Sequence, residues 1–145
     1  MSSARAARAR KLLAFETTRV ATKERELAVA RRGLADVEAV VVRAVAESRE
    51  AESRWLDEET STELLEQASE HRSTLETRVS AARQMVASAL AEVKAREGAA
   101  IAARMAERRF EILIEGFTAA DDARARKTER KSGDEHAARK TGTFR

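Results

Sequence analysis

The sequence contains no proline and no cysteine among its 145 residues, and aromatic residues make up only 3% of it. Because proline interrupts helix interiors, its absence permits very long helices. A chain without cysteine has no disulfide bonds and no thiolate metal ligands, which fits a reducing cytoplasm. A compact domain of this length normally carries more large apolar side chains for its core. These absences favour long helices over a globular domain.

The sequence also lacks a long apolar run, since no stretch approaches the ~20 residues of a membrane span. We therefore expect no direct membrane insertion. The net charge of +3 is unevenly distributed, because Glu47–Glu76 holds ten acidic and three basic residues. That segment carries a charge of −7 and the remainder +10. We expect an acidic middle and two basic ends.

The most regular pattern present is a column of residues spaced seven apart, apolar except for one serine. A second column follows three positions later, with small residues in its centre and charged ones at its ends. Heptad spacing of this kind predicts a helix that packs along its length against a partner helix. The first column is Leu13, Val20, Leu27, Leu34, Val41, Ser48 and Trp55; the second is Glu16, Lys23, Ala30, Val37, Ala44, Ala51 and Glu58.

A second apolar stripe follows in the later part of the chain. It continues to Ile101 and Met105, where the spacing changes to steps of four, so we expect the supercoil to relax near Gly98. The earlier members of this stripe are Leu64, Leu65, Ala68, Leu75, Val79, Ala82, Val86, Leu90 and Val93.

A single polar interruption, Asp57–Glu63, separates the two stripes. Within it, Thr60 and Glu63 form a capping-box pattern ahead of the second stripe. Two stripes of similar length favour a chain that folds back on itself, although one uninterrupted helix that dimerises in parallel is the alternative. The predicted fold is all-α, a long antiparallel two-helix coiled-coil hairpin with a frayed C-terminal tail. We expect a single domain over 1–145, with helix 1 at about 4–57, a turn at about 58–62, helix 2 at about 63–131 and a flexible tail at 132–145.

A turn centred near residue 59 places Leu13 opposite Met105 and leaves residues beyond about 114 without a partner from the first helix. Phe110, Leu113 and Phe117 lie on one helix face near this predicted overhang. Two interpretations are open for this stripe. It is either a docking surface, or it packs on the start of helix 1 because the turn is misplaced by several residues.

No pattern in the sequence indicates catalysis. Convergent reactive groups, metal-ligand spacing and a glycine-rich phosphate loop are all absent. We therefore expect a protein that is not an enzyme, with no cofactor and no metal. The N-terminal basic cluster is short, and the C-terminal one is interleaved with acidic residues, which favours solubility over nucleic-acid binding. Protein binding remains as the predicted role.

Two short segments resemble the type III secretion stalk proteins of the YscO (SctO) family. Trp55-Leu56-Asp57-Glu58-Glu59 is similar to the tryptophan-then-acidic segment near the hairpin tip of that family. Arg109-Phe110-Glu111-Ile112-Leu113 resembles the basic-Phe-x-x-Leu segment late in its second helix. The basic start, the length and the charged C-terminal tail are also similar. The Ser/Thr-rich tip and a less acidic tail depart from the pattern, so the related flagellar FliJ family is the alternative.

The resemblance implies a cytoplasmic protein, peripheral to the export apparatus at the inner membrane. Its partners would be the hexameric secretion ATPase, the cytoplasmic domain of the export gate and secretion chaperones. A structural homodimeric coiled coil with no secretion role is the other alternative. The residues carried over to the ATPase-binding end are Arg5, Arg8, Arg10, Lys11, Phe110, Leu113 and Phe117; those at the tip facing the export gate are Trp55, Asp57, Glu58 and Glu59.

Overall fold

A computed structural model describes residues 4–57 and 62–142, and all of these residues lie in two α-helices. Helix α1 spans Ala4–Asp57 and helix α2 spans Thr62–Gly142. The two helices pack against each other, which confirms the predicted all-α helical hairpin. The chain divides into two compact units. Unit 1 comprises residues 1–21 and 101–145, and unit 2 comprises residues 22–100.

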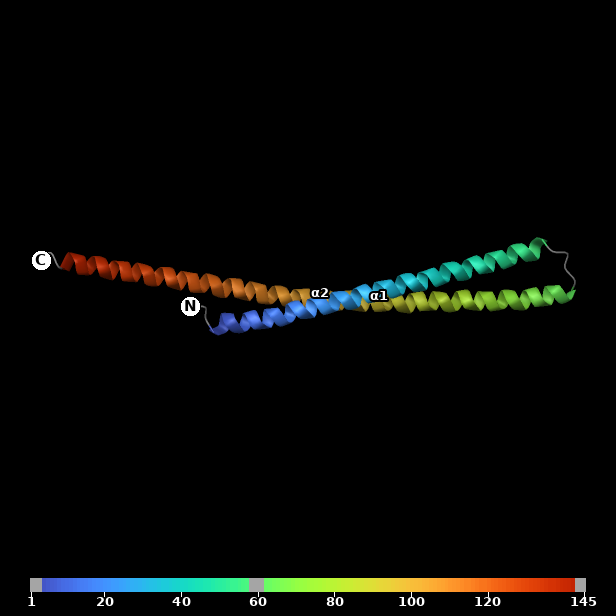
Figure 1. Cartoon of the computed structure of the whole chain (residues 1–145), viewed down its shortest axis with the longest axis horizontal. Helices are drawn as coiled ribbons and strands as arrows, with labels where there is room; N and C mark the ends of the chain where they lie inside the picture. Colours follow the sequence, from blue (N-terminus) through green and yellow to red (C-terminus); the bar gives the residue numbers. More distant parts are fainter. Residues whose placement is uncertain (1–3, 58–61, 143–145) are drawn as a thin grey trace. The chain divides into compact units, whose positions relative to one another are not determined.

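In unit 2, residues of α1 that come later in the sequence pair with residues of α2 that come earlier, so the helices are antiparallel (Figure 1). Ion pairs link Glu52 to Arg72 and Arg31 to Glu97, each at 3.4 Å. In an antiparallel hairpin, the residue numbers of two facing residues add up to twice the residue number at the turn centre. For both ion pairs this sum exceeds twice 59, the value that the expected turn centre requires. The true register is therefore shifted by several residues, and each residue of α1 faces a later residue of α2 than we expected.

The seam of α1 follows the two predicted columns, every described member of which is buried or half-buried. Both columns also extend one heptad toward the N-terminus, through Ala6 and Ala9, which are 1% and 6% exposed. The sequence analysis did not identify these two alanines, because alanine is common on every face of this chain. Glu58, the last residue of the second column, lies outside the described residues.

The seam of α2 keeps its seven-residue spacing past Gly98 and does not follow the steps of four that the sequence suggested through Ile101 and Met105. Ile101 and Met105 are 58% and 54% exposed and do not belong to the seam. Alanine, arginine and glutamate occupy several seam positions, which hides the repeat from a search for large apolar residues. One column is Ala68, Leu75, Ala82, Ala89, Arg96, Ala103, Phe110 and Phe117; the other is Val79, Val86, Val93, Ala100, Glu107, Ile114 and Asp121.

The final part of α2 lies outside the seam. Every side chain from 122 to 142 is exposed, and this segment runs past the beginning of α1 within unit 1 (Figure 1). We expected the helix to end near residue 131, but it continues to Gly142. Good helix formers on both sides of Ser132 and Gly133 compensate for the low helix propensity of those two residues. The expected turn at 58–62 and the Thr60 capping position lie almost entirely outside the described residues.

Candidate protein-interaction surface

The seam of unit 1 buries the aromatic residues that the sequence analysis placed at an overhang. Phe110 and Phe117 are half-buried, and Ala103 on the same column is 1% exposed. On α1 the buried residues begin at Ala6, whereas on α2 the covered residues end at Asp121. Antiparallel packing therefore sets the first turns of α1 against residues 114–121. The predicted overhang begins after residue 121, and Phe117 is part of the seam.

Leu113 lies beside the seam of unit 1. It is 47% exposed and occupies the heptad position just before the column that contains Ile114. On α1, Leu12 occupies the equivalent position just before Leu13 and is 50% exposed. In an antiparallel pair these two positions flank the same side of the seam. Unit 2 shows the same relation, since Val40 and Met85, which hold the equivalent positions there, line one groove.

A third apolar side chain, Phe15, belongs to the same side of α1. It lies three residues after Leu12, which places the two residues on adjacent positions of one helix face. Its exposed fraction of 66% is high for an aromatic residue. We name the side of unit 1 that carries Leu12, Phe15 and Leu113 the arginine-leucine flank, because four arginines share its heptad positions. These are Arg5, Arg8, Arg19 and Arg109.

The arginines of this flank are largely without acidic neighbours. Within the described residues no ion pair involves Arg5, Arg8 or Arg109, and all three are exposed. Arg19 lies 3.8 Å from the carboxylate of Glu16. Within 4–21 and 101–121, where the two helices of unit 1 pack together, no flanking heptad position on this side holds Asp or Glu; the remaining ones are Ala102, Ala106, Gly116 and Ala120. The flank therefore combines three exposed apolar side chains with an uncompensated positive charge.

The other predicted basic residues lie away from this flank. Arg10 is on the opposite side of the α1 seam, and Lys11 is on the outer face of the helix, as their heptad positions require. On α2, Arg108 lies on the opposite side of the seam from this flank and donates hydrogen bonds to Glu111 at 2.9 Å and Glu115 at 3.5 Å. The bond to Glu111 and the attraction of Glu115 raise the pKa of Arg108 above its usual value. Acidic neighbours thus neutralise this arginine, unlike those of the flank.

In unit 2, Trp55 is half-buried in the seam. Its ring meets the ring of His71 edge to face, with centroids 5.5 Å apart and an interplanar angle of 84°. Leu65 and Arg72 line the same shallow depression as Trp55. His71 is itself exposed to solvent, and its ring packs on one edge of the tryptophan. The side chain of Asp57, together with Glu58 and Glu59, lies outside the described residues.

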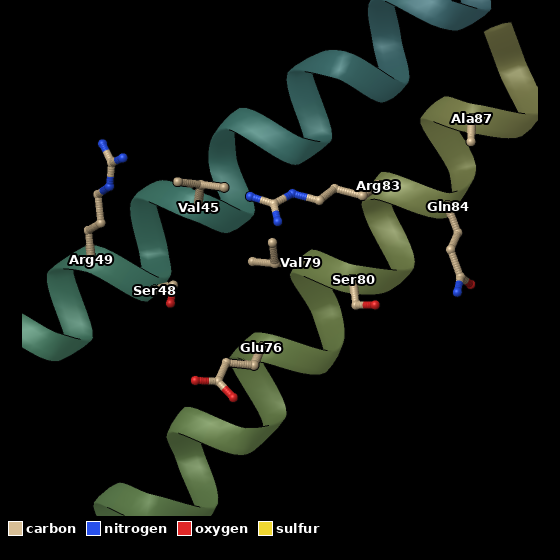
Figure 2. A pocket seen from close by; sticks show the side chains of 9 residues that line it. All are labelled: Val45, Ser48, Arg49, Glu76, Val79, Ser80, Arg83, Gln84 and Ala87. Carbon is tan, nitrogen blue, oxygen red and sulfur yellow. The ribbon is translucent and has the colours of Figure 1, made fainter.

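A shallow groove crosses both helices in unit 2, and Figure 2 shows its lining. Val79 and Arg83 of α2 point toward Val45 of α1, whereas Gln84 points away. The lining holds a single carboxylate, that of Glu76, and no histidine. An aliphatic floor with isolated charges is a surface for packing, and it offers no paired acid and base.

Two further observations concern the described part of the chain. No group of three His, Asp or Glu residues there is placed to hold a metal ion. Neither helix, over the same residues, contains a stretch that is long and apolar enough to cross a membrane. Comparison with known proteins adds no relative, because no protein-family model, curated protein or solved structure matches this chain.

Proposed function

We propose that this protein is a stalk of a type III secretion apparatus. Unit 1 would bind the hexameric secretion ATPase, and the end of the hairpin at Trp55 would face the cytoplasmic domain of the export gate. The same protein would engage export chaperones from a position in the cytoplasm, peripheral to the apparatus at the inner membrane. The proposal covers injectisome and flagellar stalks, which the same hairpin would serve equally.

One observation supports this proposal most directly. The basic start of the chain and the Arg109–Phe117 segment, which the family resemblance assigns to one functional end, belong to the same compact unit. Within that unit Arg5, Arg8 and Leu113 share one side of the seam. Two segments about one hundred residues apart in sequence thus contribute to a single surface. Such convergence is expected of the end of a protein that binds a partner. Packing of the seam does not explain it, because these exposed side chains lie outside the seam.

The test is a pull-down with a hexameric type III secretion ATPase, combined with a measurement of its ATPase rate. We expect the full chain to bind the ATPase and to change its rate of ATP hydrolysis. Leu113→Asp should weaken both effects while leaving the helical circular dichroism signal unchanged. The matched control is Ile112→Asp, which changes a neighbouring exposed residue on a different face of α2. Absence of binding, together with an unchanged ATPase rate, would refute the secretion role.

A further inference from the structure

We propose that the arginine-leucine flank of unit 1 is a docking site for an acidic amphipathic helix of a partner protein. This inference does not depend on the secretion role. The flank presents Leu12 and Leu113 from two different helices on one side of the seam, with Phe15 beside them. In helical bundles, a third helix packs into the groove between two neighbouring helices, where apolar side chains of both helices are exposed.

The charge of the flank defines the chemistry of its occupant. Arg5, Arg8 and Arg109 make no ion pair within the described residues, and the flanking positions carry no carboxylate. Guanidinium groups bind carboxylates through two parallel hydrogen bonds, which favours Glu and Asp over a diffuse negative charge. A partner helix with leucine-like residues along one face and glutamates on either side would satisfy both the apolar centre and the basic rim.

The spacing of the basic residues sets the length of the partner helix. Arg5 and Arg19 are fourteen residues apart on α1. At 1.5 Å per residue this separation corresponds to about 21 Å along the helix. A partner helix of two to three heptads spans this distance, and its apolar residues would recur at i, i+3 and i+7.

Other occupants fit this flank less well. The exposed segment 122–142 of the same chain carries seven basic and four acidic residues, and alanine is its largest apolar side chain. It would be repelled by the arginines and has nothing to place against Phe15. Nucleic acid would use the arginines but would leave the leucines exposed to water. An anionic membrane prefers one broad protruding face, whereas these three apolar residues are divided between two helices.

Fluorescence anisotropy with the full chain and a labelled three-heptad peptide tests this proposal. The peptide carries Leu along one face and Glu on both sides of it, and a matched peptide replaces every Glu with Lys. We expect the acidic peptide to bind and the basic peptide not to bind. Binding should weaken as salt is raised, because the guanidinium–carboxylate pairs lie at the solvent-exposed rim.

Matched variants of the protein locate the binding site. Phe15→Ala and Leu113→Ala should each weaken binding of the acidic peptide by about tenfold or more. The controls Met105→Ala and Ile112→Ala remove similarly exposed apolar side chains from the outer face of α2, and binding should change less than about twofold. Likewise Arg5→Gln with Arg8→Gln should weaken binding, whereas Arg10→Gln with Lys11→Gln should have a much smaller effect.

Several outcomes would overturn the proposal. Equal affinity for the acidic and basic peptides would remove the role of charge, and equal effects of the flank and control variants would place the site elsewhere. Retention on phosphatidylserine vesicles without binding of the acidic peptide would show that the flank binds membranes. Self-association in sedimentation that is lost in Phe15→Ala would show that a second copy covers the flank. The peptide assay contains no component of a secretion apparatus. Its result is therefore independent of the ATPase pull-down, and either experiment can fail without the other.

Discussion

Among the individual residues of unit 1, burial separates those that hold the hairpin closed from those that are free to bind. Phe110 and Phe117 lie in the seam, whereas Leu113 between them is 47% exposed. Deeply buried alanines on α1, with Ala6 at 1% exposure, let the helices approach closely enough for large aromatic residues to fill the space. Adjacent apolar residues of similar type therefore have different roles, determined by heptad position.

We predict that Phe117→Ala lowers the free energy of unfolding by about 1–3 kcal/mol, less than for a fully buried phenylalanine because this one is half-buried. Ile112→Ala, at a 54% exposed position, should change it by less than about 0.5 kcal/mol. Urea unfolding followed by circular dichroism measures both variants. If the two variants were equally stable, Phe117 would not belong to the seam.

Charged residues also occupy the seam, which is one reason why apolar spacing alone did not locate the seam of α2. Arg96 occupies a seam position of α2 and donates a hydrogen bond to Glu26 of α1 at 2.9 Å and another to Glu92 at 2.7 Å. The hydrogen bond to Glu92, followed by the attraction of both carboxylates, raises the pKa of Arg96 above its usual value. Arg96 thus occupies its seam position as a charged group that is paired with a carboxylate of the other helix.

At the scale of the helices, the sequence predicted α1 better than the later part of α2. Apolar residues such as Leu27 and Leu34 mark the α1 seam, and heptad spacing alone locates them. In α2 the seam passes through Arg96 and Glu107, while the exposed Ile101 and Met105 suggest a false continuation. Side-chain hydrophobicity could not reveal the position of Arg96, because its ion pair with Glu26 forms only once the partner helix is present.

The register between the helices was the other feature that the sequence did not determine. A heptad repeat looks alike after a shift of seven residues, and no glycine or proline marks the turn. Because we misplaced the register, we expected Phe117 to lie outside the seam. The misplaced register also concealed the arginine-leucine flank, since we expected Leu113 on one face with Phe110 and Phe117, whereas it lies beside the seam that contains them.

The exposed segment of α2 should contribute helicity without contributing to the stability of the hairpin. Residues 122–142 make no burying contact, so removing residues 122–145 should leave the free energy of unfolding within about 0.5 kcal/mol of the full chain. The mean residue ellipticity of this segment, obtained by difference, should be partial, because an isolated helix of this length is only marginally stable. Thermal and urea unfolding of both forms measure the difference. A loss greater than about 1 kcal/mol would show that the segment packs on the hairpin.

For the whole molecule, the most informative property is the distribution of charge between the units. The described residues of unit 1 contain fifteen basic and nine acidic residues, whereas those of unit 2 contain twelve basic and fourteen acidic ones. Unit 1 therefore carries a charge of +6 and unit 2 a charge of −2. The net charge of the chain, +3, conceals this separation, which would steer an acidic partner toward unit 1.

Because each seam is filled by the same chain, we predict a protein whose unfolding does not depend on concentration. The melting temperature should stay constant over a hundredfold range of protein concentration. A homodimeric coiled coil would instead melt at higher temperature as concentration increases, since association stabilises only the folded state. Differential scanning fluorimetry, with Trp55 as the intrinsic probe, distinguishes the two. A steady rise in melting temperature would favour the structural homodimer.

The short connection between Asp57 and Thr62 has a consequence for how the protein folds. Pairing the helices near this connection closes the smallest loop, and every further layer of the seam closes on a loop that is already formed. The hairpin would thus zip from Trp55 and His71 toward Ala6 and Phe117. The arginine-leucine flank, built from the segments farthest apart in sequence, would be completed last. A partner that requires both sides of that flank would then recognise only chains whose folding has finished.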